Sequence, residues 1–144
     1  MEQVHASCVA VDGLGILIRG APGSGKSDLA ARLIDQGAQL VADDRVDLAC
    51  RDGGIVASAP AAIAGLLEVR GVGILRMTHR AEAEVGLVVD LVGPDDVERL
   101  PQTAFHDYMG VAVPLLRAWP FEPSAAAKIR FAVAALKGAV SWAS

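Results

Sequence analysis

Cysteine is scarce in this chain, and runs of like charge are missing. The 144 residues include two cysteines, Cys8 and Cys50, which lie far apart and in no metal-ligand spacing. Two reduced thiols are the simplest interpretation, so we expect neither a disulfide nor a cysteine-bound metal. No run of lysine or arginine stands out and the formal net charge is −4. This balance argues against nucleic acid as a partner.

Long apolar runs are also missing. No apolar stretch approaches the roughly 20 residues that a membrane-spanning helix needs. Residues 1–11 carry an acidic Glu2 and lack the basic-then-apolar order of a signal peptide. The sequence therefore predicts no membrane association and a cytoplasmic location. Hydrophobic residues make up 53% and charged residues 21% of the chain, which is typical of a globular protein, and we expect one domain over residues 1–144.

The most specific motif is an octapeptide that fits the phosphate-binding loop pattern G-x-x-x-x-G-K-[ST] without mismatch. Its residues are Gly20, Ala21, Pro22, Gly23, Ser24, Gly25, Lys26 and Ser27. An apolar run at residues 16–18 precedes it, and residues 28–36 follow with helical spacing. Backbone N–H groups and the helix dipole favour a phosphate at such a junction. Lys26 can reach the outer phosphates and Ser27 can ligate Mg²⁺, so we predict that the chain binds a nucleotide or another polyphosphate.

The rest of the pattern predicts an α/β fold in which strands outnumber helices. The expected strands cover residues 4–11, 15–19, 38–42, 46–50, 55–57, 87–92 and 111–113. Asp12-Gly13 and Asp52-Gly53 are typical of tight hairpin turns, and hairpins favour a mixed sheet over a purely parallel one. A last helix should begin at a Ser124 cap and end near Gly138. We expect connectors at residues 78–84 and 93–103, and either a helix or a loop at 60–67.

An acidic pair, Asp43 and Asp44, follows the apolar residues 40–42. Two adjacent carboxylates repel each other unless a cation lies nearby. The pair is therefore a candidate Mg²⁺ site, and the alternative is a solvated turn.

Other charged residues are ambiguous from the sequence alone. Glu68 lies inside an apolar segment, so it either faces solvent from a strand or points into a site. Arg99 by itself indicates a surface charge. His5, His79 and His106 stand in no metal-binding spacing and, by themselves, favour structural or surface positions.

Three stretches taken together resemble the catalytic domain of the HPr kinase/phosphorylase family. They are residues 4–27, residues 39–44 and residues 67–75, and the last matches the family motif (I/L)-E-(I/V)-R-G-x-G-I. The resemblance covers nearly the whole chain. It implies the short, single-domain form found in proteobacteria, and a fold related to the nucleotide-binding core of phosphoenolpyruvate carboxykinase.

The resemblance also implies roles around the bound phosphates. Lys26 would neutralise the transferred phosphoryl group. Ser27 and Glu68 would be Mg²⁺ ligands, with Asp43 supporting the metal or orienting its neighbour. Asp44 would be the base that takes the proton from a serine hydroxyl.

Two further residues match the family's active site. His5 corresponds to a histidine at the start of a strand, and Arg99 to an arginine, by a looser alignment. The implied activity is an ATP-dependent, Mg²⁺-dependent serine kinase that acts on HPr, the phosphocarrier protein of the phosphotransferase system. The family also implies a homo-oligomer, specifically a hexamer.

One segment departs from the family. A P-G-R-N-type loop, associated with the phosphorylase direction, usually precedes the last helix, whereas residues 121–126 lack the Gly, Arg and Asn and carry only the negative charge of Glu122. A phosphate acceptor needs a cation or N–H donors beside it, so we expect weakened phosphorylase activity. Two alternatives stay open: a phosphate-loop kinase for a small metabolite, and a nucleotide-sensing regulatory module without turnover.

Overall fold

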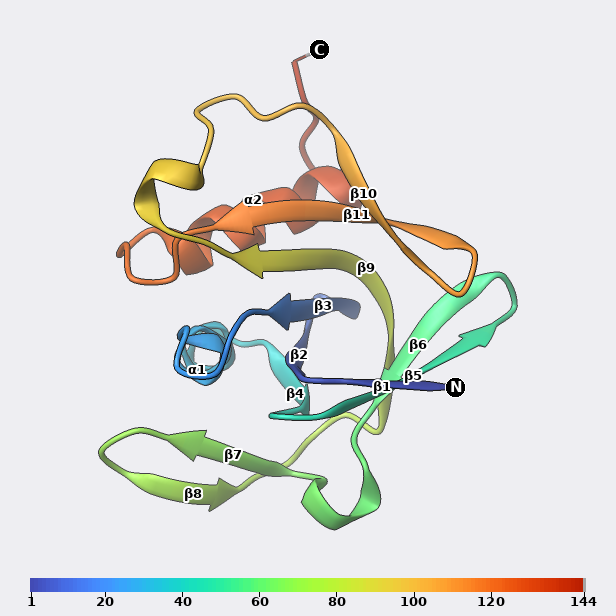
Figure 1. Cartoon of the computed structure of the whole chain (residues 1–144), viewed down its shortest axis with the longest axis vertical. Coiled ribbons are helices and arrows are strands. Elements are labelled where there is room, and N and C mark those ends of the chain that lie inside the picture. The colour runs from blue at the N-terminus through green and yellow to red at the C-terminus, as the bar shows by residue number, and fades with distance from the viewer. Residues whose placement is uncertain (144) are drawn as a thin grey trace.

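A curled mixed β-sheet forms the centre of the protein (Figure 1). The computed structural model describes residues 1–143. The strand order is β1-β5-β6-β9-β3-β2-β4, with β11 pairing with β9 and β10 with β11. The strands of this sheet are β1 (Glu2–Val4), β2 (Ala6–Val11), β3 (Leu14–Arg19), β4 (Gln39–Ala42), β5 (Val46–Arg51), β6 (Gly54–Ser58), β9 (Glu82–Leu91), β10 (Ala104–Tyr108) and β11 (Val111–Ala118). The predicted mixed α/β fold is confirmed.

Strand directions explain why the sheet is mixed. β9 runs parallel to both β3 and β11 and antiparallel to β6. The β2–β3 and β5–β6 pairs are antiparallel hairpins, as the Asp-Gly turns predict. Asp12 and Asp52 have φ of 50° and 53° and are each followed by a glycine with positive φ, which is the backbone that a two-residue hairpin turn requires.

The two helices share one core layer with the central strands. α1 (Lys26–Asp35) and α2 (Ala125–Leu136) bury apolar side chains against the same sheet face, which presents Ile16 and Ile18 from β3. The opposite face carries Leu17 and packs against β5, β6 and the β10–β11 hairpin, because the sheet curls over it. The central strands are therefore buried on both faces. Among residues 1–143, no helix combines the length and apolar character needed to cross a membrane.

β7 (Leu66–Val69) and β8 (Gly73–Arg76) form a separate two-stranded sheet. This small sheet lies apart from the main sheet in Figure 1. Two one-turn 3₁₀ helices, η1 (Ala61–Ile63) and η2 (Pro94–Asp96), fall inside segments where a helical turn or a loop was expected.

Several boundaries differ from the sequence expectation. β9 begins at Glu82, inside the expected connector, because Ala83 and Val85 alternate with exposed glutamates and enter the core. The expected strand over residues 4–11 is divided at His5. Ser124 occupies the predicted cap position of α2, but its hydroxyl makes no hydrogen bond to the helix, so the predicted capping contact is wrong.

Candidate phosphate-binding site

The phosphate-loop motif lies between the end of β3 and the start of α1, as predicted. Gly25 precedes the helix with φ 103° and ψ 16°, a left-handed conformation that suits glycine. Gly20 is required for a different reason, since a Cβ there would overlap the Ser24 hydroxyl oxygen. Both glycines let the loop close tightly in front of the N-terminus of α1.

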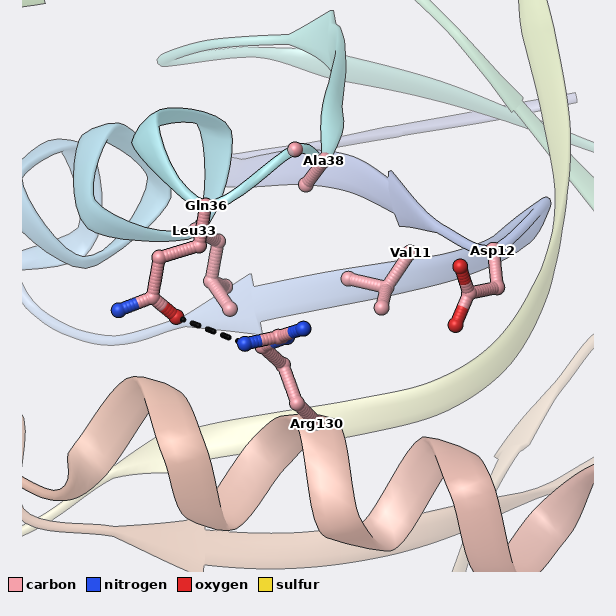
Figure 2. Close-up of a pocket in the computed structure, with 7 residues that line it drawn as sticks. Val11, Asp12, Leu33, Gln36, Ala38 and Arg130 are labelled. Atoms are coloured by element: carbon pink, nitrogen blue, oxygen red, sulfur yellow. Dashed lines mark hydrogen bonds between the residues drawn. The ribbon is translucent and has the colours of Figure 1, made fainter. Parts of the chain in front are cut away.

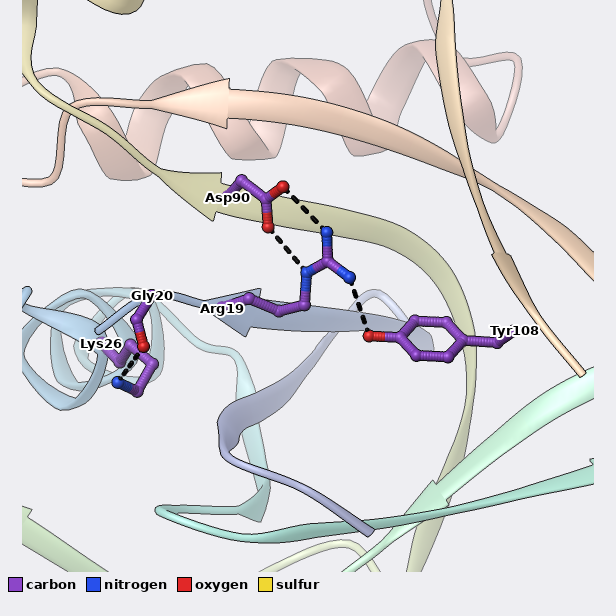
Figure 3. A network of polar contacts seen from close by, with 5 residues as sticks. All are labelled: Arg19, Gly20, Lys26, Asp90 and Tyr108. Carbon is purple, nitrogen blue, oxygen red and sulfur yellow. Dashed lines mark hydrogen bonds and ion pairs between the residues drawn. The ribbon is translucent and has the colours of Figure 1, made fainter. Parts of the chain in front are cut away.

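The Lys26 ammonium lies across this loop. Its Nζ donates hydrogen bonds to the carbonyl oxygens of Gly20 at 2.7 Å and Ala21 at 3.0 Å, and Figure 3 shows the first of these. The Ser24 N–H donates to the same Ala21 carbonyl at 3.0 Å, which closes the turn. The positive charge of Lys26 therefore lies close to the free N–H groups and the positive dipole end of α1. Together these groups attract phosphate.

Asp43, directly after β4, is the meeting point of four segments. The Ser27 hydroxyl donates to its carboxylate at 2.8 Å and 3.1 Å, and the Ser7 hydroxyl on β2 donates at 2.6 Å. The backbone N–H of Glu68 on β7 lies 3.4 Å from the other carboxylate oxygen, Oδ2. Asp43 is only 7% exposed, so these donors compensate the burial of its polar atoms.

The donor set at this point suits a magnesium ion. Hydroxyl and carboxylate oxygens are the hard ligands that Mg²⁺ prefers, and proteins usually supply only one or two of them beside substrate phosphates. Within residues 1–143, no group of three or more His, Cys, Asp or Glu side chains is arranged to hold a metal. The Ser27 hydroxyl and the Asp43 carboxylate, 2.8 Å apart, are oxygen groups of this hard type.

Asp44 has an unusual backbone and an open side chain. Its φ is 71°, and the Arg45 N–H donates to the Asp43 carbonyl at 2.9 Å across it, which closes a three-residue turn. Left-handed conformations at residues other than glycine are strained and concentrate at functional sites. The side chain is 74% exposed and its carboxylate lies 3.8 Å from Arg45 Nε. The turn thus presents this carboxylate outward, next to buried Asp43.

The structure brings some of the other candidates to the site. Glu68 is exposed on β7, and its backbone N–H lies 3.4 Å from the Asp43 carboxylate, so its backbone lies beside the site. His5 is exposed between β1 and β2, next to Ala6, which pairs with the residue preceding Gly20. Arg99 lies exposed between η2 and β10, and no hydrogen bond or ion pair within residues 1–143 joins it to the loop or to Asp43.

A polar network missed by the sequence analysis fixes the strand ends behind the loop (Figure 3). Arg19 donates from Nε and Nη2 to the Asp90 carboxylate at 2.7 and 2.8 Å, and from Nη1 to the Tyr108 hydroxyl at 3.0 Å. The hydrogen bonds that Arg19 donates to the Asp90 carboxylate raise the pKa of the Arg19 guanidinium. The network ties β3 to β9 immediately before Gly20. The sequence does contain a pattern that could have predicted this ion pair: Arg19 and Asp90 are charged residues of opposite sign at or near the ends of two apolar strands.

Ser7 is the second residue that sequence reasoning missed. It lies on β2, every residue of which is buried. A lone hydroxyl in such a strand must find a partner, and here the partner is Asp43.

A small pocket at the other end of α1 lies outside this site (Figure 2). It measures about 160 Å³ and is lined by the last turn of α1, by the β2–β3 turn and by Arg130 of α2. Arg130 donates a hydrogen bond to Gln36 at 3.3 Å across it. The loop lies at the N-terminal end of the ten-residue helix α1 and the pocket at its C-terminal end. Such a helix is about 15 Å long, so the pocket is not part of the phosphate site.

Fold and geometry together define a phosphate-loop domain of the mixed α/β class. Residues 1–137 match the family model described as the HPr Serine kinase C-terminal domain, and the chain belongs to this family. It is similar to the HPr kinase/phosphorylase of Clostridium botulinum (strain Eklund 17B / Type B), with 36% identity over 122 residues, covering 77% of this chain and 40% of that protein. It is also similar to the HPr kinase/phosphorylase of a Geobacillus species, with 44% identity over 96 residues, covering 61% of this chain and 31% of that protein.

A solved structure supports the same relationship. The Hpr(Ser) kinase/phosphatase from Coxiella burnetii superposes with a TM-score of 0.82 at 28% identity, covering 92% of this chain and 94% of that one. The chain spans about two fifths of the length of the first of these relatives.

Proposed function

We propose that this domain is an ATP-dependent serine kinase whose acceptor is an HPr-type phosphocarrier protein of the phosphotransferase system. The observation that carries the proposal is the assembly of Lys26, Ser27 and the Asp43–Asp44 pair around one phosphate loop. The acceptor is suggested by the names of the relatives, which are called HPr kinase/phosphorylase.

Phosphate binding would follow from the loop. The N–H groups at the start of α1 and the Lys26 ammonium would hold the triphosphate of ATP, with the outer phosphate toward Ser27 and Asp43. Fixing the donor in this way supplies positioning and charge stabilisation, which make up most of the catalysis of phosphoryl transfer.

Magnesium would be held by Ser27 and Glu68, with Asp43 beside them as support. When bound, Mg²⁺ neutralises charge on the phosphate oxygens. The contribution of the protein is to orient these ligands, and the hydrogen bonds that Asp43 accepts from Ser7 and Ser27 restrict its rotation.

Asp44 would accept the proton of the attacking serine hydroxyl. Its outward carboxylate can be reached by a side chain of another protein, whereas buried Asp43 cannot. His5 and Arg99 are proposed to act in the same active site on the acceptor side, since both are exposed and accessible to an incoming substrate. Arg99 would need the acceptor or a loop movement to bring it near the phosphates.

The phosphorylase direction is proposed to be weak. The segment before α2 carries only Glu122, and this carboxylate is engaged by Lys128 at 2.6 Å. An inorganic phosphate acceptor would therefore meet a neutralised lysine and no P-G-R-N-type loop. Phosphate-dependent release of pyrophosphate from serine-phosphorylated HPr should be much slower than the forward reaction, and a release as rapid as phosphorylation would overturn this point.

We also propose that residues 1–144 act as one catalytic domain in a homo-oligomer, a hexamer by family resemblance. Analytical ultracentrifugation of the protein tests this directly. A monomer at micromolar concentration would exclude the assembly without excluding the kinase.

The test of function is transfer of labelled phosphate from Mg-ATP to purified HPr, with wild type and Asp44→Asn side by side. We expect label on a serine of HPr from the wild type only, with ATP binding kept in the variant. Label in a small metabolite and none in HPr would favour a metabolite kinase. ATP binding without any transfer would favour a nucleotide sensor.

A further inference from the structure

A second pocket opens directly beside the phosphate loop, on the side away from Asp43. It measures about 260 Å³ and is lined by seven residues: Ser24 of the loop, Leu91, Val92 and Gly93 at and after the end of β9, and Trp119, Pro120 and Phe121 after β11. All but Ser24 are apolar. Nothing in the phosphoryl-transfer scheme above uses this pocket.

Phe121 is the most unusual part of the wall. Its side chain is 63% exposed, so the ring is accessible to a ligand. A Cβ placed on Gly25 would contact the Phe121 ring at 3.3 Å, so the ring lies against the backbone of the loop itself. Trp119, two residues earlier, is half-buried in the same pocket.

The aromatic wall is fixed to the helix that follows the loop. Arg32 of α1 donates hydrogen bonds to the carbonyl oxygens of Pro120 and of Glu122, the latter at 3.3 Å. The Glu122 carboxylate is held in turn by Lys128 of α2. A wall anchored to both helices loses little further freedom when a ligand binds, which favours affinity.

The sheet order sets the direction of a bound nucleotide. β2 and β4, which lead to Asp43, lie on one side of β3, while β9 and β11 lie on the other. β3, β9 and β11 are parallel, so their carboxyl ends meet at one edge, where ligands of such sheets bind. A triphosphate with its outer end at Ser27 and Asp43 therefore points its other end toward Trp119 and Phe121.

Ser24 belongs to both the phosphate loop and the second pocket. Its hydroxyl oxygen is buried and has no hydrogen-bond partner within residues 1–143. A buried hydroxyl without a partner calls for a ligand group or an ordered water molecule.

We propose that this pocket binds the nucleobase of the nucleotide whose phosphates occupy the loop, by stacking against Phe121 and Trp119. The proposal rests on the proposed nucleotide-dependent function and adds to it the base-binding surface. Stacking on aromatic rings accepts any base, because every base has a π face. The apolar lining offers little to distinguish adenine from guanine, so ATP and GTP should bind alike and a pyrimidine nucleotide more weakly.

The experiment compares Mg-ATP with magnesium tripolyphosphate, which carries the phosphates without the base, by isothermal titration calorimetry. In Phe121→Ala the affinity for ATP should fall roughly five- to hundredfold, the range that loss of one base–aromatic stack produces, while tripolyphosphate affinity stays within twofold. Phe131→Ala is the matched control, since Phe131 is an equally exposed phenylalanine on α2, at 71%. It should change neither affinity. Phe121→Trp keeps a ring at this position and should preserve ATP binding.

Three outcomes overturn the proposal. Equal losses for ATP and tripolyphosphate in Phe121→Ala would mean that Phe121 supports the loop and not the base. Unchanged ATP affinity would remove the base from this pocket while leaving the kinase function intact. If the wild type binds neither ligand, the proposed nucleotide-dependent function fails and this inference fails with it.

Discussion

The hydroxyl of Ser7 donates a 2.6 Å hydrogen bond to the carboxylate of Asp43, joining the buried strand β2 to the end of β4. Ser7 is fully buried and comes from a strand with no part in the phosphate loop. The bond restricts the rotation of Asp43 and thereby sets the direction of the oxygens that meet Ser27. Ser7 is accordingly a positioning residue for the proposed metal site.

Replacement of this serine tests that relationship. Ser7→Ala should cost about 1 kcal/mol of unfolding free energy, because a buried acceptor loses one donor. The concentration of Mg²⁺ that half-saturates activity should rise roughly tenfold, as expected when the outer support of a metal ligand is removed. Measuring rate against Mg²⁺ at fixed ATP separates the two effects. Ser58→Ala, on β6, is the control and should leave the Mg²⁺ dependence unchanged. A loss of stability without any shift in Mg²⁺ dependence would make Ser7 purely structural.

Asp44 allows backbone and chemical roles to be separated. Asparagine and glycine both tolerate the φ of 71° at this position, so Asp44→Asn and Asp44→Gly should fold as stably as the wild type. Both should lower the rate of transfer by roughly 10² to 10⁴-fold, the usual worth of a general base, with ATP affinity kept. Thermal melts and single-turnover transfer give the two readouts. Full activity in either variant would assign the proton to another group.

Two ion pairs of similar geometry but different burial provide an internal comparison. Arg19 and Asp90 are bonded through two hydrogen bonds, with side chains 22% and 30% exposed. Arg51 and Glu82 are also joined by two hydrogen bonds, but their side chains are 52% and 48% exposed. Asp90→Ala should lower the unfolding free energy by about 1–3 kcal/mol, since it leaves a partly buried charge without its acceptor. Glu82→Ala should have a much smaller effect, because water replaces an exposed partner. Urea titration of both variants checks this, and equal effects would contradict it.

The two cysteines should differ in reactivity. Burial raises the pKa of the Cys8 thiol from 9.0 to about 12, whereas Cys50 is exposed. A thiol reagent at pH 8 should therefore modify one cysteine in the native protein and two after denaturation. Rapid modification of both in the native state would show that β2 opens readily.

The same shift predicts a stability change at alkaline pH. Below pH 9 both the folded and the unfolded state keep the Cys8 proton, so the thiol contributes no pH dependence there. Between pH 9 and about 12 only the unfolded state loses it, so stability falls as the pH rises through this window. The decline measured for wild type should be steeper than that of Cys8→Ala, and equal slopes would contradict the assignment.

Motif-bearing segments could be predicted from the sequence because their physics is local. The loop from Gly20 to Ser27 and the Asp12-Gly13 and Asp52-Gly53 turns each need particular backbone angles that few residues supply. The structure places these elements where the sequence predicts them. The left-handed turn at Met109, which joins β10 to β11, was missed because methionine is not a typical residue for it.

Features that depend on distant partners could not be predicted. β10 is mostly exposed, so it shows no apolar alternation. Ser7 and Asp43 are 36 residues apart, and only the pairing of β2 with β4 brings them together. The proposed roles of His5, Arg99 and Glu68 rest on family resemblance, since neither composition nor spacing distinguishes them from surface residues.

The position of β9 has a consequence for how the chain folds during synthesis. This strand pairs with β3 on one side and with β6 and β11 on the other, yet it starts only at Glu82. Until the ribosome has released it, both β3 and β6 present unpaired edges, which are the surfaces most prone to aggregation. The domain should therefore depend on chaperones while its first half emerges, and its sheet should close in one late, cooperative step.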